Sequence, residues 1–364
     1  MTRRPSSPLS PSIDPVRARH TRRSVLTLLL LAVGLLTLWT VRPALAQEAA
    51  FTLKLASVAP SETPWATGLE AFKASVEAKS AGKIKVRAFL NGVQGDENET
   101  VDKCYKGQLQ GVGASTGSIA SIVPELSVLE LPYLFRSATE ADHILDKVIT
   151  PTVEKAFAGK GLVLGFWSEN GFRSFGTSFG AIRTPADLKG RKMRAQENNV
   201  HLEMYRAFGA SPVPIPVTEV LTSLQTGVVE GYDNTPLFSQ AAQWTGATKF
   251  YSLTQHIYQP AAIVFNKAWF DSLPADLRAL VLAEGRALVP GMRSQIRAMD
   301  PFLLQNMTAM RIQVYTPTAA EKASFDAPAK QARDNYLAKA TAGEKALYKQ
   351  ITDGLAAYRA AGGK

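Results

Sequence analysis

The sequence predicts an α/β protein with two domains. Segments that alternate apolar and polar residues, as strands do, take turns along the chain with segments whose apolar residues recur at helical spacing. The length of 364 residues suits two domains at roughly 100–200 residues each. A hydrophobic content of 46% allows each domain a core of its own. This alternation favours parallel sheets buried between helices.

The first half of the alternation lies between residues 51 and 175. Apolar and polar residues alternate in 51–57 and 84–90, and the turn dipeptide Asn91-Gly92 ends the second strand. Two separate short strands follow at 162–167 and 172–175. Apolar spacing, capping residues, prolines and terminal glycines predict the helices at 65–76, 96–106, 137–147 and 151–159.

The second half continues in the same way. Strands are predicted at 192–196, 228–232, 261–265 and 311–315, and helices at 199–208 and 217–225. Pro274 opens a long helix from 275 to about 310, bent at Pro290 or Pro301. The capping boxes Thr184-x-x-Asp187 and Thr318-x-x-Glu321 predict a helical turn and the start of a helical C-terminal tail.

Composition and charge exclude several classes of protein. Cys104 is the single cysteine, so a disulfide scaffold is excluded. The net charge of +10 suggests a nucleic-acid partner. However, residues 1–46 hold seven Arg and one Asp and so account for +6, which leaves +4 for the rest. We therefore expect no nucleic-acid partner.

Residues 1–46 have the pattern of a signal peptide. A basic stretch ends in Arg22-Arg23, an apolar run covers 25–41, and Ala44-Leu45-Ala46 forms a small-residue cleavage site. This predicts a periplasmic protein. The paired arginines resemble a twin-arginine export signal, with Sec export and a retained N-terminal anchor as alternatives. No later apolar run has a spanning length, so we do not expect the mature protein to be membrane-embedded.

One motif raises the alternative of a serine hydrolase. Residues 113–117 (GASTG) match the G-x-S-x-G nucleophile elbow, with Ser115 as the nucleophile. The motif needs a strong strand before it, and the Gly- and Gln-rich residues 107–111 make a poor one. The histidines of the mature chain, at 143, 201 and 256, are too scattered to suggest a metal site. We therefore expect neither an enzyme nor a cofactor.

Arginines and an amide stand inside segments that otherwise resemble buried strands. Arg173 lies in NGFRSF, Arg194 lies in GRKMRAQ, and Asn234 follows the strand at 228–232. A buried guanidinium needs an anionic partner, and its planar fork fits a carboxylate in two parallel hydrogen bonds. That partner is either an internal Asp or Glu or a bound ligand. Open α/β sheets bind ligands at strand ends, so these positions are candidates for an anion site.

The same segments resemble the extracytoplasmic solute-binding subunit of TRAP (tripartite ATP-independent periplasmic) transporters, of the dicarboxylate type. The resemblance runs in order through nearly all of residues 51–300. It is carried by 91–99 (NGVQGDENE), 123–135 (VPELSVLELPYLF), 184–194 (TPADLKGRKMR), 208–216 (FGASPVPIP) and 220–231 (VLTSLQTGVVEG).

This resemblance implies a periplasmic binding protein of the two-lobe, type II-like (Venus-flytrap) kind, with a hinge and a long helix spanning both lobes. Lobe one would comprise 47–171 plus 260–299, and lobe two 172–259 plus 300–364. A small-molecule carboxylate would close the lobes, and the closed complex would be read by the membrane permease subunits of the transporter.

The resemblance also implies site residues. The family's carboxylate-clamping Arg matches Arg194, a second Arg matches Arg173, and the amide of its strand-end turn matches Asn234. This chain has Glu230 where the family usually has Asp, and Thr235 shifts the turn by one residue. Further candidates near the cleft, each with a surface or core position as the alternative, are Glu99, Trp65, Trp167, Tyr232 and Trp244. A larger lipophilic ligand, with Arg194 purely structural, is the alternative to an organic acid.

Overall fold

The structure is a computed structural model that describes Met1 and residues 49–363. The signal peptide predicted at 1–46 lies, Met1 apart, outside the described residues. Within the described part of the chain, no helix combines the length and the apolar character that crossing a bilayer requires. Residues 49–364 form one compact unit.

A single mixed sheet of nine strands runs through this unit. The strands are β1 (Phe51–Ser57), β2 (Ile84–Phe89), β3 (Gly111–Ser115), β4 (Leu162–Thr177), β5 (Lys192–Ala195), β6 (Ser211–Pro214), β7 (Gly231–Asn234), β8 (Phe250–Asn266) and β9 (Gln313–Tyr315). Their hydrogen-bonded order is β2-β1-β3-β8-β4-β7-β5-β6, and β9 pairs with β8.

Two long strands, β4 and β8, are shared by both halves of the sheet. One end of β8 pairs with β3 through Ala261–Phe265, and its other end pairs with β9 through Phe250–Ser252. The far end of β4 pairs with β7. The β2-β1-β3 half and the β7-β5-β6 half are thus the sheets of two lobes joined by continuous strands. The lobe boundaries expected at 171/172 and 259/260 lie where Gly171 of β4 pairs with Gln259 of β8. The pairing of these two strands shifts register between Glu169 and Gly171.

Two expectations about these strands are wrong. Residues 162–167 and 172–175 form one continuous strand, and 261–265 is only the end of β8. The sheet is mixed rather than parallel, because β4 pairs antiparallel with both β8 and β7. The polar stretch 168–171 looks like a break in the sequence. In the structure it stays in the strand because its polar groups find partners: Glu169, for example, accepts a hydrogen bond from Arg297 Nε at 2.9 Å.

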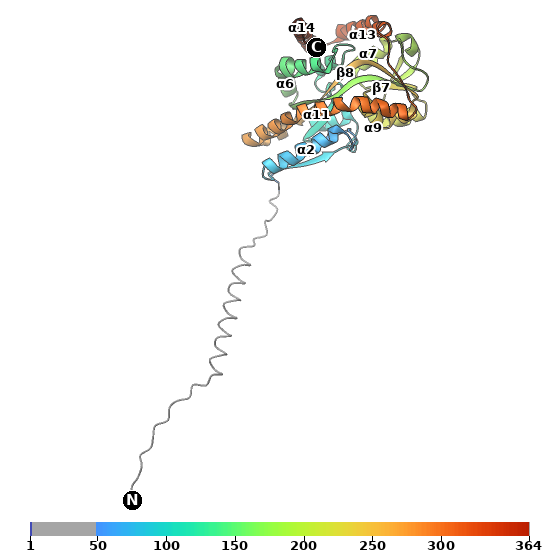
Figure 1. The fold of residues 1–364 in the computed structure, drawn as a ribbon. Coiled ribbons are helices and arrows are strands. Elements are labelled where there is room, and N and C mark those ends of the chain that lie inside the picture. Colours follow the sequence, from blue (N-terminus) through green and yellow to red (C-terminus); the bar gives the residue numbers. More distant parts are fainter. Residues whose placement is uncertain (2–48, 364) are drawn as a thin grey trace. The chain divides into compact units, whose positions relative to one another are not determined.

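Helices cover both faces of the sheet (Figure 1). They are α2 (Pro64–Lys79), α3 (Glu97–Tyr105), α4 (Thr116–Ile119), α5 (Ala138–His143), α6 (Thr150–Gly159), α7 (Asn199–Ala207), α8 (Val220–Gln225), α9 (Pro236–Ala241), α10 (Lys267–Ser272), α11 (Ala275–Ala309), α12 (Ala319–Ala323), α13 (Asp326–Lys339) and α14 (Ala342–Ala360). A π-helical turn, Ile144–Ile149, joins α5 to α6, and a 3₁₀ helix spans Pro124–Glu130.

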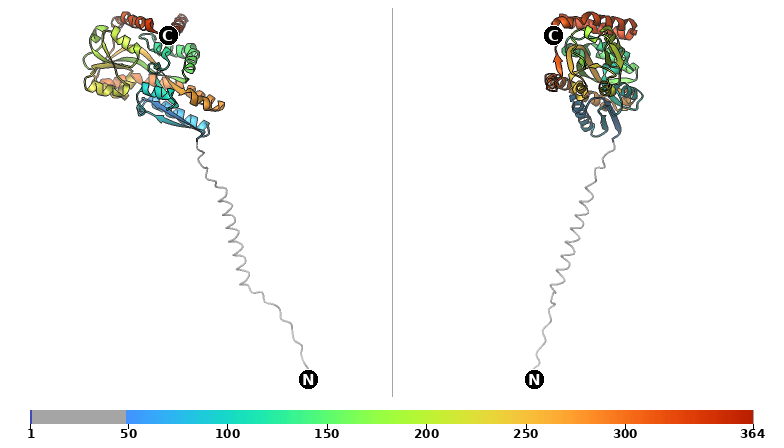
Figure 2. Two further views of the ribbon diagram at one scale, coloured as in Figure 1. Left: turned by 180° about the vertical axis from the view of Figure 1, so that it is seen from behind. Right: turned by 90° about the vertical axis from the view of Figure 1, so that its right-hand side faces the viewer.

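The helix α11 is the long helix predicted after Pro274, and it contains Pro290 and Pro301. It packs on α2 of lobe one, along β4, and on α9 of lobe two. Figures 1 and 2 show it running across the folded unit between these helices. The chain therefore crosses between the lobes in β4, in β8 and in α11, which leaves few positions where a hinge can bend.

Close packing of α11 on β4 explains a glycine inside the helix. A Cβ at Gly285 would lie 2.2 Å from Cδ1 of the buried Phe166 ring. We expect Gly285→Ala to lower the free energy of unfolding by about 1–3 kcal/mol through overpacking. Gly291 of the same helix is the matched control, since nothing lies within 4 Å of its Cβ position. Gly291→Ala is expected to raise stability by about 0.4–1 kcal/mol. Urea denaturation of both variants measures the difference, and equal shifts would contradict the packing argument.

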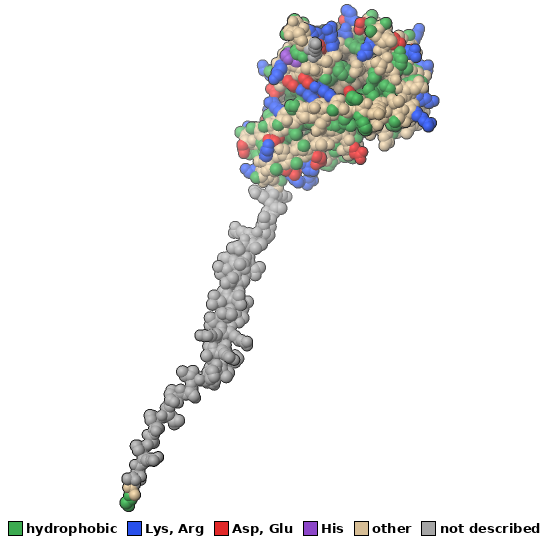
Figure 3. Space-filling model, viewed as in Figure 1, with side chains coloured by type: hydrophobic (Ala, Val, Ile, Leu, Met, Phe, Trp, Pro, Cys, Tyr) green, Lys and Arg blue, Asp and Glu red, His purple; other side chains and the backbone are tan. Residues whose placement is uncertain are grey.

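Charged side chains of both signs are interspersed on the face of the folded unit seen in Figure 3. On the C-terminal helices some of them form helical pairs four residues apart, such as Lys330 with Asp334 and Lys349 with Asp353. Pairs of this kind neutralise one another locally, so this face presents no extended field of a single sign.

Candidate ligand-binding site

A cavity lies where the two lobes face each other across the crossing strands. Lobe one contributes residues from β1, α2, α3 and β3, and lobe two contributes residues from β5, β7 and α9. The floor comes from β4 and β8, through Asn170, Arg173 and Gln259. The space open to the centres of water-sized molecules is about 50 Å³, enough for a few waters or one small solute. The site is therefore small and lies between the lobes.

Arg194 is a buried cation without an acidic partner. Its side chain comes from β5, is 2% exposed, and lines the cavity. Nε donates to Ile215 O at 2.9 Å, and the guanidinium lies 5.5 Å from the Trp244 ring centre. Among residues 49–363, no carboxylate lies within ion-pair distance of it. Burial and the charge of Arg173 lower the pKa of Arg194 to about 10, so it stays protonated at neutral pH.

Arg173 also lines the cavity, but its charge is paired. Nε donates to Asp233 Oδ2 at 2.6 Å, Nη2 donates to Asp233 O, and Nη1 donates to Gln259 Oε1 at 2.8 Å. Although burial opposes ionisation, Arg173 holds the pKa of Asp233 well below its usual range. Arg173 can offer a ligand its remaining N–H groups, but no uncompensated charge.

Two further predicted residues, Asn234 and Trp65, also line the cavity. Asn234 ends β7, and its Oδ1 accepts from Thr235 N at 2.8 Å. Its side-chain N–H₂ has no acceptor among the residues that the structure describes, so it is available to a ligand. The indole N–H of Trp65 donates to Glu169 O at 2.9 Å, so Trp65 presents only its apolar ring to the cavity.

The structure places four other candidates, Glu99, Trp167, Tyr232 and Trp244, outside the cavity. Glu99 points to solvent on α3, with its side chain 56% exposed and paired with Lys103 at 2.7 Å. Trp167 lies in a hydrophobic core cluster and donates to Thr150 Oγ1 at 2.8 Å. Tyr232 is fully buried against Trp244, with ring centres 5.1 Å apart. Each has packing or ion-pair partners of its own, which sequence patterns could not show.

Sequence reasoning missed several polar residues of the cavity, among them Glu97, Asn170, Gln196 and Gln259. Glu97 lies two residues before Glu99, and helical geometry turns it to the opposite side of α3. Asn170 lies in the polar stretch of β4 that separates two predicted strands in the sequence pattern. Gln196 stands two residues after Arg194, and that spacing on a strand was the one available signal.

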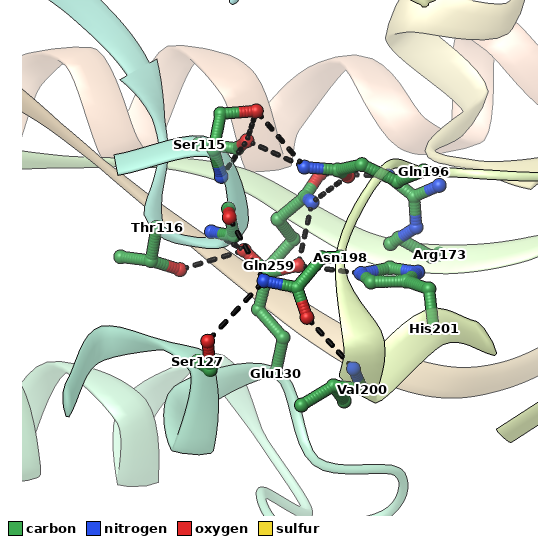
Figure 4. Close-up of polar contacts among 12 residues, drawn as sticks. Ser115, Thr116, Ser127, Glu130, Arg173, Gln196, Asn198, Val200, His201 and Gln259 are labelled. Atoms are coloured by element: carbon green, nitrogen blue, oxygen red, sulfur yellow. Dashed lines mark hydrogen bonds and ion pairs between the residues drawn. The ribbon is translucent and has the colours of Figure 1, made fainter. Parts of the chain in front are cut away.

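A buried hydrogen-bond network supports the cavity floor (Figure 4). Gln259 accepts from Arg173 and from Asn170 Nδ2, and it donates to Gln196 Oε1 at 2.8 Å and to Glu130 Oε2 at 2.9 Å. Glu130 of lobe one also lies 2.7 Å from His201 Nε2 of lobe two. Gln259 thus uses its whole amide to hold groups from both lobes in place, which preorganises the floor.

Ser115 lies in the same neighbourhood without the partners of a nucleophile. Its hydroxyl donates to Glu97 Oε2 at 2.8 Å and accepts from Gln196 Nε2 at 2.9 Å. No histidine is bonded to it among the described residues, and His201 is engaged with Glu130. Nor does the described chain hold a group of three or more His, Cys, Asp or Glu side chains arranged for a metal ion.

Comparisons with known proteins show what the chain is similar to. A solute-binding protein of Verminephrobacter eiseniae is 39% identical over 214 residues, which are 58% of this chain and 64% of that protein. The 2,3-diketo-L-gulonate-binding periplasmic protein YiaO of Escherichia coli is 28% identical over 73% of this chain and 81% of its own length. A TRAP periplasmic solute-binding protein from Sulfitobacter with bound β-D-galacturonate superposes with a TM-score of 0.79. It is 26% identical over 83% of this chain and 99% of that one.

The family assignment rests on most of the folded chain. The model of the bacterial extracellular solute-binding protein family 7, DctP, matches residues 55–340. That range contains the crossing strands β4 and β8, the helix α11 and the cavity. The chain therefore belongs to the DctP family of solute-binding proteins of TRAP transporters.

Proposed function

We propose that this protein captures an organic acid in the interlobe cavity, with the ligand carboxylate held by Arg194. The observation that carries the proposal is the buried guanidinium of Arg194, which has no acidic partner among residues 49–363. An isolated charge is costly to bury, and this cost is offset when an anion supplies the missing partner. In a dry cavity the same pair is far stronger than in water. Arg173 and Asn234 then offer hydrogen bonds, and Trp65 covers an apolar part of the ligand.

The mechanism is closure of two lobes around the ligand. Contacts already join the lobes beside the cavity: Asn198 Nδ2 donates to Gly117 O at 2.9 Å, and Val217 N donates to Asp96 Oδ1 at 2.7 Å. With lobe one at 47–171 plus 260–299 and lobe two at 172–259 plus 300–364, these contacts break on opening. A ligand that touches both walls favours the closed form by its extra affinity for that form.

The family and the cavity support a transport role rather than catalysis. A closed complex would be recognised by the membrane permease subunits of a TRAP transporter, after export to the periplasm by the segment 1–46. A lipophilic ligand with a purely structural Arg194 is disfavoured, since a structural arginine would be expected to have an internal acid partner. A hydrolase using Ser115 is disfavoured because its hydroxyl is bonded to Glu97 rather than to a histidine.

The identity of the ligand tests the proposal. We expect mass spectrometry of the small molecule released from the purified mature protein to show an organic acid. Calorimetry with that acid should then give saturable binding at one site per chain. A released neutral lipid, or an acid whose affinity does not depend on Arg194, would contradict the proposal.

A further inference from the structure

The cavity holds one uncommitted positive charge and one negative charge. Arg173 and Arg194 are the basic residues of its lining, and Asp233 neutralises the first. Glu97 is the acidic residue of the lining; it comes from α3, whereas Arg194 comes from β5. Glu97 and Arg194 are not within ion-pair distance of each other. The two charges therefore face different parts of a bound molecule.

Glu97 is held as a hydrogen-bond acceptor. Its Oε1 accepts from Ser115 N at 2.9 Å, and its Oε2 accepts from Ser115 Oγ at 2.8 Å and from Ser118 Oγ at 2.9 Å. Ser115 Oγ in turn accepts from Gln196 Nε2 at 2.9 Å. Burial raises the pKa of Glu97, while the hydrogen bonds from Ser115 oppose that rise. All of these donors satisfy a carboxylate. Oε2 already accepts two hydrogen bonds, whereas Oε1 accepts one and keeps capacity for one more.

We propose that Glu97 determines specificity by accepting a hydroxyl of the ligand and rejecting a second carboxylate. The ligand class that fits is a hydroxylated monocarboxylate, with its acid group on Arg194 and hydroxyl groups toward Glu97 and the amides of the floor. This inference rests on the proposed function and narrows it. A dicarboxylate would bring two negative charges to a lining that offers one free cation and already contains Glu97. Like charges brought together in a buried site cost several kcal/mol.

The amides of the cavity agree with this class. Among residues 49–363, nothing accepts from the side-chain N–H₂ of Asn234 and nothing donates to the side-chain oxygen of Asn170. The Asn170 amide makes its hydrogen bond through Nδ2, which donates to Gln259 Oε1 at 3.1 Å. Such groups recognise hydroxyls, which both donate and accept. A second carboxylate would match only the donor groups and would leave the acceptors beside it unpaired.

Matched pairs of acids test the inference by calorimetry on the mature protein. Each pair has one carbon skeleton and differs by a terminal CH₂OH against COO⁻: D-erythronate and meso-tartrate, D-gluconate and D-glucarate, D-galactonate and galactarate. We expect the monoacid of the best-bound pair to bind roughly 10- to 100-fold more tightly than its diacid, as like-charge repulsion requires.

The variant Glu97→Gln removes the charge and keeps the shape. We expect Glu97→Gln to lower the ratio of the diacid Kd to the monoacid Kd by about tenfold or more, mainly because the diacid binds more tightly. Glu99→Gln is the matched control on the same helix, and its solvent-facing carboxylate should leave the ratio unchanged. Circular dichroism checks that each variant is folded.

The outcomes separate this inference from the proposed function. Diacids that bind the wild type as tightly as monoacids, or a ratio that Glu97→Gln does not change, overturn the inference while the capture of acids stands. Failure of every acid to bind, or binding that Arg194→Ala does not weaken, contradicts both.

Discussion

Replacing Arg194 with alanine is expected to weaken binding of the organic acid by ~2–5 kcal/mol, or roughly 30- to 4,000-fold in Kd. The guanidinium is the uncommitted cation of the cavity, so its loss leaves the buried carboxylate of the ligand without a counter-charge. Calorimetric titration of the mature protein with its ligand measures the change. An alanine variant with wild-type affinity would remove Arg194 from the site.

Two further variants separate charge from geometry at this position. Arg194→Lys keeps a positive charge but loses the planar fork, so we expect an intermediate Kd. Arg191→Ala is the matched control three residues earlier, because Arg191 is partly exposed and already paired with Glu230 at 2.8 Å. It should leave Kd within about a factor of two of wild type, as expected for a surface ion pair. A similar loss in both alanine variants would indicate a general effect of charge instead.

Replacing Asp233 with alanine is expected to lower the free energy of unfolding by about 3–5 kcal/mol, the range for breaking a buried ion pair. Asp233 is fully buried, accepts from Arg173 Nε at 2.6 Å and from Tyr205 OH at 2.8 Å, and lies 3.4 Å from His256 Nε2. Its loss leaves Arg173 as an unpaired buried cation beside Arg194. Urea denaturation of the ligand-free protein measures the loss.

A double variant tests whether this cost comes from the stranded charge. Arg173→Met combined with Asp233→Leu removes both charges, so we expect it to be more stable than Asp233→Ala alone. The pKa of Asp233 is lowered in the folded state, so its contribution is complete at neutral pH. That contribution is lost as the pH falls from about 4 toward the folded-state pKa. A double variant less stable than the single one would contradict the explanation.

Local sequence patterns were enough to predict most of the helices and strands. The capping boxes predicted at Thr184 and Thr318 form, with Asp187 Oδ2 accepting from Thr184 N at 2.8 Å and Glu321 Oε2 accepting from Thr318 N at 2.7 Å. The strands at 51–57 and 84–89 and the long helix after Pro274 also form as predicted. These features are decided by residues within a turn or two of each other, and the sequence contains them directly.

The site was only partly predictable. Arg194, Arg173, Asn234 and Trp65 line the cavity, and they were found because a charge or an amide in a buried-looking segment, or a resemblance to a family, marked them. Glu97 and Gln259 carry no such mark, because a glutamate on a polar helix and a glutamine in a strand are ordinary residues. They matter only because β3, β5 and β8 bring Ser115, Gln196 and Gln259 together.

The sequence alone determined the class of fold, the order of its elements and the presence of a cation that lacks a local partner. Only the tertiary structure decided which arginine keeps its charge for a ligand. Asp233 lies 60 residues from Arg173 along the chain and reaches it through the pairing of β4 with β7. The same packing that neutralises Arg173 leaves Arg194 without an acid. The physical reason is that the cost of a buried charge depends on which groups lie within a few ångströms in space, and strand pairing sets that distance.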